Sequence, residues 1–279
     1  MTLPKARSTT DVDVPAVSVL YIGPAKSGKT TCALSWPSPL VLYFEPNMAG
    51  LIGTHDIPYL TVDDMKPDVI SALQQVILPT ILNGKIAEIV GERPIRTIVF
   101  DSLTELLGTH MSKSVRGAKE TLKGFDDFGT FLYRSENFMH AQILPLVRAG
   151  FNVVCTCHIT QMGGEPIMQK DARDKWVQVG TEPIFRRPAI PGRFRDLVAS
   201  RFDAVLLTGS ELVAERNAAG GVTGGRASSF FVETINPDRS YEGIGDGLGK
   251  QDGRFTRLPP RLDGRYPSLA KAWGFAETK

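Results

Sequence analysis

The chain has 279 residues, of which 42% are hydrophobic and 22% are charged. This is an ordinary globular composition, and it excludes disordered, fibrous and disulfide-scaffold proteins. The net charge is only +2, so a strongly basic nucleic-acid-binding domain is excluded and any nucleic-acid-binding surface must be local.

The N-terminal segment 1–16 is polar and aperiodic, and we expect a flexible arm there. It lacks the apolar centre of a secretory signal, and no apolar run approaches the roughly 18 residues of a membrane span, so we expect a soluble, cytoplasmic protein with no membrane partner. The three cysteines, Cys32, Cys155 and Cys157, do not suggest a disulfide framework or a zinc site. Cys155 and Cys157 are predicted to lie on one face of a buried strand.

Apolar runs alternate with helical patterns between residues 17 and 210. The predicted strands are 17–22, 39–44, 97–100, 151–157 and 203–207. The predicted helices run from Lys29 to about Trp36, through 69–81 and from Phe128 to Ala149, with interruptions at Pro79 and Pro145. Because each strand is a continuous apolar run, the pattern predicts an α/β fold, a mostly parallel sheet with helices on both faces.

Beyond Leu207 the apolar residues follow a two-residue period. The segments ELVAER and SFFVETI flank the glycine-rich segment 217–228, which predicts a β-hairpin extension with a flexible loop. Basic residues outnumber acidic ones in the later segment 250–271, which we interpret either as a DNA-binding surface or as a solvated tail.

A phosphate-binding loop is predicted where the first strand meets the first helix. GPAKSGKT matches the motif G-x-x-x-x-G-K-[ST] in full. Its glycines let backbone N–H groups face the β- and γ-phosphates of a nucleotide, Lys29 supplies a positive charge, and Thr30 offers a hydroxyl to Mg²⁺. The predicted nucleotide-binding residues are Gly23, Pro24, Ala25, Lys26, Ser27, Gly28, Lys29 and Thr30.

Three polar residues end predicted strands, at the edge where an α/β sheet binds ligands. Asp101 is expected to hold Mg²⁺ through water or to cap the following helix, and these roles are compatible. Glu45 is either the group that activates the attacking water or a loop carboxylate before a proline. His158 either senses the γ-phosphate or has a structural role.

Five segments occur in order: GPAKSGKTT, VLYFEPN, TIVFDSLTEL, NVVCTCHIT and PAIPGRFRDLVASRFDAVLL. This set resembles the RecA-like P-loop ATPases of bacteriophages, within them the nucleotide-binding family that includes single-strand-annealing recombination proteins. The resemblance covers residues 17 to about 210 and implies Gly23–Thr31, with Thr31 included, as the phosphate loop for ATP, Asp101 as the Mg²⁺ carboxylate and His158 as the sensor. Such relatives usually carry a second acidic residue where this chain has Asn47, so hydrolysis is expected to be slow or to depend on Glu45.

The resemblance also implies DNA-binding loops after the third and fourth strands. Basic residues occur in segments 111–125 and 159–200, and the second also contains Trp176 and Phe185. Cations interleaved with aromatic residues can follow a phosphate backbone and stack on unpaired bases, although a solvated surface loop is the alternative. The candidate DNA-binding residues are Lys113, Arg116, Lys119, Lys123, Lys170, Arg173, Lys175, Arg186 and Arg187.

We therefore expect a flexible arm (1–16), a RecA-like ATPase core (17–210) and a hairpin with a basic C-terminal extension (211–279). The expected function is that of an ATP- and Mg²⁺-dependent, single-stranded-DNA-binding ATPase in phage recombination or replication, located in the bacterial host cytoplasm. The resemblance implies a homo-oligomeric ring or filament, with Arg186, Arg187 and Arg193 as candidates for a residue that completes a neighbour's site. It also suggests a single-stranded-DNA-binding protein as a partner.

Two alternatives remain open. A P-loop kinase for a small molecule would use the basic segment 159–200 as a lid over its acceptor pocket. A nucleotide-dependent adaptor would bind ATP with little turnover, and Asn47 is the feature that favours it.

Overall fold

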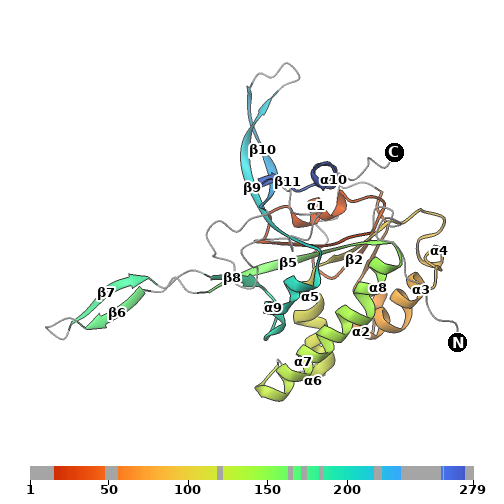
Figure 1. The fold of residues 1–279 in the computed structure, drawn as a ribbon, viewed down its shortest axis with the longest axis horizontal. Helices are drawn as coiled ribbons and strands as arrows, with labels where there is room; N and C mark the ends of the chain where they lie inside the picture. Colours follow the sequence, from red (N-terminus) through yellow and green to blue (C-terminus); the bar gives the residue numbers. More distant parts are fainter. Residues whose placement is uncertain are drawn as a thin grey trace, which may run out of the picture.

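The computed structural model describes most of the chain, and its arrangement is shown in Figure 1. The described residues are 16–47, 56–117, 122–162, 166–170, 175–181, 185–216, 222–233, 259 and 261–273. The predicted N-terminal arm, except for Ala16, therefore lies outside them, as do part of the hairpin loop and residues 250–258 and 260 of the C-terminal basic segment.

Within these residues nine strands form one sheet, in the order β11-β10-β9-β1-β5-β4-β2-β3, with β8 paired to β5. Six strands pair in parallel, which confirms the predicted mostly parallel α/β fold. They are β1 (Ser18–Gly23), β2 (Pro39–Tyr43), β3 (Tyr59–Thr61), β4 (Thr97–Asp101), β5 (Asn152–Met162) and β9 (Ala204–Arg216). The antiparallel strands are β8 (Phe185–Pro188), β10 (Val222–Glu233) and β11 (Arg261–Asp263).

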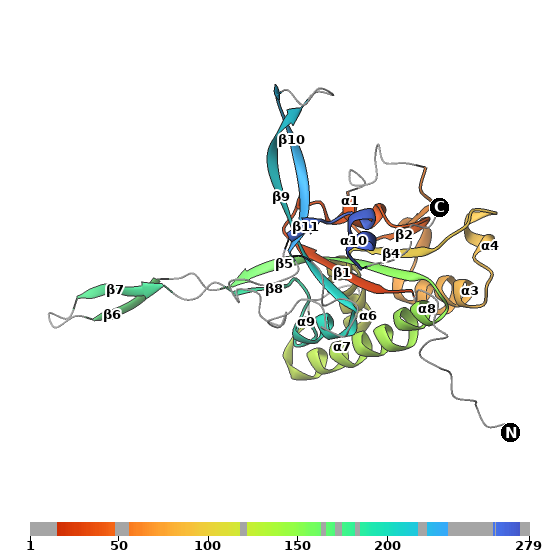
Figure 2. The ribbon, with the colours of Figure 1, turned by 45° about the horizontal axis from the view of Figure 1, so that its top comes forward.

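Helices cover both faces of the sheet, as the continuous apolar strands predict (Figures 1 and 2). Successive side chains of a strand point to opposite faces, so Tyr21 packs with α1 (Lys29–Leu34) and α10 (Tyr266–Trp273). Leu20 faces the larger cluster on the other side, where most of the remaining helices pack. Cys155 and Cys157 are both fully buried in that larger cluster, which confirms their predicted placement on one face.

The two long predicted helices are built from consecutive short segments. Segment 69–81 contains α2 (Val69–Ala72), the π-helix η4 (Leu73–Ile77) and α3 (Leu78–Leu82). The predicted helix 128–149 begins earlier, as α7 (Gly124–Phe138), and continues through the π-helix η6 (Met139–Ile143) into α8 (Leu144–Arg148). Pro79 and Pro145 each lie in the first turn of the last segment, because proline lacks the N–H that a helix interior requires.

The other helical segments are short. On the helix-rich face they are α4 (Ala87–Val90), α5 (Leu103–Glu105), the π-helix η5 (Leu106–Met111), α6 (Ser112–Arg116) and α9 (Phe194–Leu197). Two 3₁₀ turns, η3 (Asp63–Met65) and η7 (Val198–Arg201), complete the set in the described ranges. The first helix, α1, ends at Leu34, two residues before the predicted end. None of the helices in the described part of the chain has the length and apolar character needed to cross a membrane.

The C-terminal part of the chain joins the main sheet. The predicted hairpin is confirmed as β9 and β10, but β9 unites two predicted strands in 13 residues, so residue 210, the expected end of the core, lies inside it. β10 begins at Val222, within the segment expected to be a loop, because pairing to β9 is made by the backbone and tolerates its glycines.

The end of the basic segment is part of the core. Leu269 and Trp273 of α10 are buried against α1, and the Tyr21 hydroxyl donates a 2.8 Å hydrogen bond to the Gly264 carbonyl. The solvated-tail interpretation is therefore wrong for residues 261–271. Arg261, Arg265 and Lys271 gave this segment a basic character and concealed a helical apolar pattern. In that pattern Leu269 and Trp273 lie four residues apart on one face.

Segment 159–200, where we expected a loop, contains the end of β5 and three further strands in its described part. The fourth strand, β5, continues five residues past its expected end and pairs with β8. Between them, β6 (Pro166–Lys170) and β7 (Trp176–Thr181) form a separate two-stranded hairpin that stands away from the body of the protein (Figures 1 and 2). We call β6 and β7 the side hairpin.

Candidate nucleotide-binding and catalytic site

The predicted phosphate loop lies between β1 and α1, as the motif requires. Gly28 precedes the helix with φ of +86°, a left-handed conformation that glycine adopts without steric cost. Beside the loop lies a cavity of about 520 Å³. Six of its lining residues come from the loop and α1: Ala25, Lys26, Gly28, Lys29, Thr30 and Thr31.

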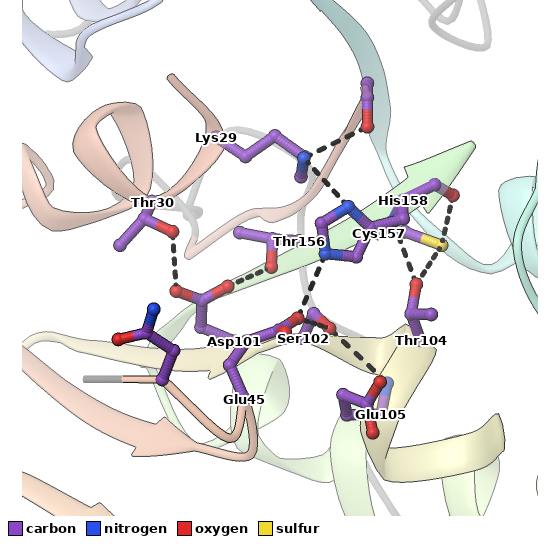
Figure 3. Close-up of polar contacts among 12 residues, drawn as sticks. Lys29, Thr30, Glu45, Asp101, Ser102, Thr104, Glu105, Thr156, Cys157 and His158 are labelled. Atoms are coloured by element: carbon purple, nitrogen blue, oxygen red, sulfur yellow. Dashed lines mark hydrogen bonds and ion pairs between the residues drawn. The ribbon is translucent and has the colours of Figure 1, made fainter. Parts of the chain in front are cut away.

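The same cavity contains all three polar residues predicted at the strand ends. Glu45 follows β2, Asp101 ends β4, and His158 lies within β5 opposite Gly23 of β1. Figure 3 shows these side chains turned toward one another and toward Lys29. Their convergence follows from the sheet, because the carboxyl ends of neighbouring parallel strands meet at one edge.

Asp101 is held by two threonine hydroxyls. Its Oδ2 accepts a 2.8 Å hydrogen bond from Thr30 Oγ1, and its Oδ1 accepts one from Thr156 Oγ1. Burial raises the pKa of Asp101 despite these two hydrogen bonds. The helix-cap interpretation is wrong, because Ser102 caps α5 by accepting from the Glu105 N–H. Sequence reasoning missed Thr156, although it is a polar residue within the apolar run of β5.

Lys29 turns back onto its own loop. Its Nζ donates to the Gly23 carbonyl at 3.0 Å and to the Pro24 carbonyl at 2.7 Å, and lies 3.3 Å from His158 Nδ1. Burial lowers the pKa of Lys29, against the opposing effect of Asp101. An ammonium group only donates, so Nδ1 of His158 acts as the acceptor and the imidazole proton lies on Nε2.

Glu45 accepts hydrogen bonds from both His158 and Ser102. His158 Nε2 lies 3.1 Å from Glu45 Oε1, and the Ser102 hydroxyl donates to the same oxygen. Burial acts to raise the pKa of Glu45, but these hydrogen bonds outweigh it and the pKa lies below its ordinary value. His158 is in turn fixed through its backbone N–H, which donates a 2.9 Å hydrogen bond to Thr104 Oγ1.

β10 also lines the cavity, although the sequence analysis assigned this segment to a separate extension. Ser228 and Phe230 line the cavity, and Phe230 packs so closely on Gly28 that a Cβ atom there would lie 2.3 Å from its ring. Ser27 Oγ also lies 2.6 Å from Thr208 Oγ1 of β9. The signal in the sequence is the aromatic pair in SFFVETI, but only the sheet order brings it beside the loop.

Tyr43, the last residue of β2, and Asn47, four residues further on, also line the cavity. The backbone carbonyl of Asn47 accepts a hydrogen bond from the Tyr43 hydroxyl. Burial, together with the nearby Asp101 and Glu45, raises the pKa of Tyr43 to about 12, so this hydroxyl remains protonated at neutral pH. Glu45 is therefore the acidic group of this segment that lines the cavity.

The predicted DNA-binding residues lie in two separate regions. Lys113 and Arg116 are in α6, and Lys123 precedes α7. Arg116 Nε forms a 2.5 Å ion pair with Asp127 of α7. Lys170 ends β6, Lys175 immediately precedes β7, and Arg186 and Arg187 are in β8. Lys175 is exposed and Arg187 is partly buried, whereas only the backbone of Lys170 and Arg186 is described. Lys119 and Arg173 lie outside the described residues.

A first prediction concerns the cost of burying Asp101. Its folded-state pKa is raised above the unfolded-state value, so ionisation destabilises the fold at neutral pH. This cost shrinks as the pH falls through the folded-state pKa and disappears below the unfolded-state pKa. Asp101→Asn keeps the shape and can still bond both threonines. We expect the ligand-free variant to melt higher at pH 7, by about 2–4 °C per kcal/mol gained, and to lose Mg²⁺-dependent hydrolysis. Thermal unfolding from pH 7 to pH 4 measures this, and a lower melting temperature at pH 7 would contradict it.

The fold and the cavity define a P-loop nucleotide-binding protein of the α/β class. Residues 16–218 match the AAA domain family, which is more than half of the chain, and the chain belongs to this family of P-loop ATPases. Family membership supports nucleotide binding and ATPase activity in general.

Comparison with solved structures gives a similar chain, the flagellar accessory protein FlaH from Methanocaldococcus jannaschii. The two chains are 12% identical, with a TM-score of 0.35, over 85% of this chain and 84% of that one. A likeness at this level carries no inference about function. No curated protein matches the chain.

Proposed function

We propose that this protein is an ATP- and Mg²⁺-dependent ATPase that binds single-stranded DNA and acts in phage DNA recombination or replication. The observation that carries the nucleotide part is the single cavity in which Lys29, Thr30, Glu45, Asp101 and His158 meet beside the phosphate loop. The specific part, action on single-stranded DNA, rests on the sequence resemblance and on the placement of the basic segments.

The residues present suit Mg²⁺. Thr30 Oγ1 and Asp101 supply the hydroxyl and carboxylate oxygens that this cation prefers, and a nearby cation would offset the burial that raises the pKa of Asp101. When bound, Mg²⁺ neutralises charge on the phosphates. Thr156 would keep the Asp101 carboxylate in position through its hydrogen bond.

The chain's own residues would divide the remaining work. Lys29 would exchange its bonds to the Gly23 and Pro24 carbonyls for bonds to phosphate oxygens, and so place its charge where negative charge develops. Glu45, whose pKa is lowered, is ionised at neutral pH and would accept the proton of the attacking water. His158 would keep Glu45 oriented from one side while its Nδ1 faces Lys29.

The DNA-binding part of the proposal is supported by the side hairpin. Trp176 is 64% exposed at the start of β7, and Lys175, the residue before it, is also exposed, so an aromatic ring and a cation are both available where the hairpin projects. Such pairs bind unpaired bases and phosphates with little sequence preference. The side hairpin follows β5 in the chain, and β5 also carries His158, which lines the nucleotide cavity. A shift of β5 on DNA binding would therefore be transmitted through the backbone to His158.

The proposed assembly is a homo-oligomeric ring or filament in the host cytoplasm, with a single-stranded-DNA-binding protein as a possible partner. Arg193 is exposed at the start of α9 and is a candidate, with Arg186 and Arg187, for a residue that enters a neighbour's nucleotide site. The adaptor with little turnover is the second candidate, and the amide of Asn47 in the cavity favours it.

A second prediction tests the DNA surface by charge reversal. Arg186→Glu/Arg187→Glu should weaken binding of a fluorescent single-stranded oligonucleotide by about tenfold or more. It should also reduce the salt dependence by about one unit of slope for each phosphate that the variant no longer neutralises. Fluorescence anisotropy at a series of salt concentrations measures both quantities.

The matched control is Lys85→Glu/Arg148→Glu. It changes the net charge equally. Lys85 lies just before α4 and Arg148 ends α8, and in Figure 1 both helices are on the side of the molecule opposite β8. The control should retain most of the binding and the full salt slope. Equal losses of affinity in the two variants would show that only net charge matters, and would remove β8 from the DNA-binding surface.

A further inference from the structure

One face of β10 runs from the core into the nucleotide cavity. Val232, Phe230 and Ser228 alternate along the strand and therefore share this face. Val232 is fully buried with Cys32 and Ala33 of α1, Phe230 is partly buried on Gly28, and Ser228 is exposed at the cavity.

The opposite face of β10 fixes the strand in place. Phe231 packs on Gly209 of β9, and the Arg261 guanidinium carbon lies 3.5 Å from the centroid of its ring. β10 is also paired along β9, where Phe230 lies opposite Ser210. Phe230 is thus held from both sides of its strand, and its ring forms a preformed wall of the cavity.

The sheet order places this wall on the far side of the phosphate loop from the carboxylates. The loop follows β1, with β5, β4 and β2 on one side of it, and these strands position His158, Asp101 and Glu45. β9 and β10 lie on the other side and supply Phe230 and Ser228. A ligand whose terminal phosphate and metal lie at the carboxylates therefore has its remaining part directed toward β10.

We propose that Phe230 forms the contact for the nucleobase of the bound nucleoside triphosphate, with Ser228 beside the sugar or base. This inference rests on the proposed nucleotide function and specifies the subsite of that cavity. A phenyl ring offers a flat apolar surface on which any base can stack, so Phe230 should strengthen nucleotide binding without selecting among bases. The C-terminal hairpin thereby becomes part of the nucleotide site.

The test compares ATP with inorganic tripolyphosphate, which has the phosphates but no base. Dissociation constants for both ligands, in the presence of Mg²⁺, are measured by isothermal titration calorimetry for the full chain. Phe230→Leu keeps an apolar side chain over Gly28 and removes the aromatic face, and Phe230→Tyr keeps that face. Leu212→Ala, at a 66% exposed position on β9, is the control.

We expect Phe230→Leu to weaken ATP binding by about tenfold and tripolyphosphate binding by less than about twofold, whereas Phe230→Tyr and Leu212→Ala retain both. Equal weakening for both ligands in Phe230→Leu would show that Phe230 acts on the phosphate loop through Gly28, and would overturn the base contact. Unchanged ATP binding would also overturn it, while the proposed nucleotide function stands. If the unmodified protein binds neither ligand, both the inference and the proposed function are wrong.

Discussion

Replacing Lys29 with alanine will reduce ATP turnover by a factor on the order of 10² to 10³, the loss typical of removing one charge-stabilising donor from a transition state. Lys29 is the loop residue whose Nζ lies within 3.3 Å of His158 and bonds two loop carbonyls, so its charge lies at the centre of the cavity. Steady-state release of phosphate measures the loss.

The control is Lys85→Ala, which removes a lysine from an exposed pair with Glu88 and lies outside the cavity. It should leave turnover unchanged. Full turnover in Lys29→Ala, together with unchanged ATP binding by isothermal titration calorimetry on the same preparation, would remove the phosphate-loop assignment. A trace of contaminating ATPase could produce turnover but not stoichiometric binding.

Glu45→Gln should separate binding from turnover. The amide oxygen can still accept the hydrogen bonds from His158 and Ser102, so the cavity keeps its shape, but the group can no longer take up a proton. We expect turnover to fall by a factor of about 10² to 10⁴ with ATP affinity nearly unchanged. Glu105→Gln is the matched control, because Glu105 accepts from Thr109 outside the nucleotide cavity.

The pH profile gives an independent measure of the same group. The profile is measured at saturating Mg²⁺, which would offset the burial that raises the pKa of Asp101. The hydrogen bonds to Glu45 lower its pKa, so under this condition we expect the active carboxylate to persist to a pH below the ordinary range of glutamate. Ser102→Ala removes one of these hydrogen bonds and should move the acid limb to higher pH. An unmoved limb, or equal turnover in Glu45→Gln, would assign proton transfer to another group.

Local sequence signals predicted the central part of the molecule well. The continuous apolar runs identified the five main parallel strands, because strands buried on both faces show no polar alternation. The phosphate motif and the polar strand ends identified residues that the sheet brings into one cavity. These predictions succeed because each depends on a few adjacent residues and on one rule of parallel-sheet geometry.

The remaining features depend on contacts between distant segments. Phe230 reaches Gly28 only because β10 pairs with β9 and β9 pairs with β1. Trp273 is buried because Trp36 and α1 lie under α10, although the surrounding segment is rich in basic residues. The side hairpin escaped prediction because polar and exposed strands carry little apolar periodicity, so their pairing is not visible in the sequence.

The most direct test of the proposed function is the steady-state rate of Mg²⁺-dependent ATP hydrolysis by the unmodified protein, with and without single-stranded DNA, beside Lys29→Ala. We expect a basal rate that single-stranded DNA increases, and no such increase in Lys29→Ala. Hydrolysis that DNA does not change would contradict a DNA-coupled ATPase, and DNA-independent phosphorylation of a small molecule would identify a kinase instead.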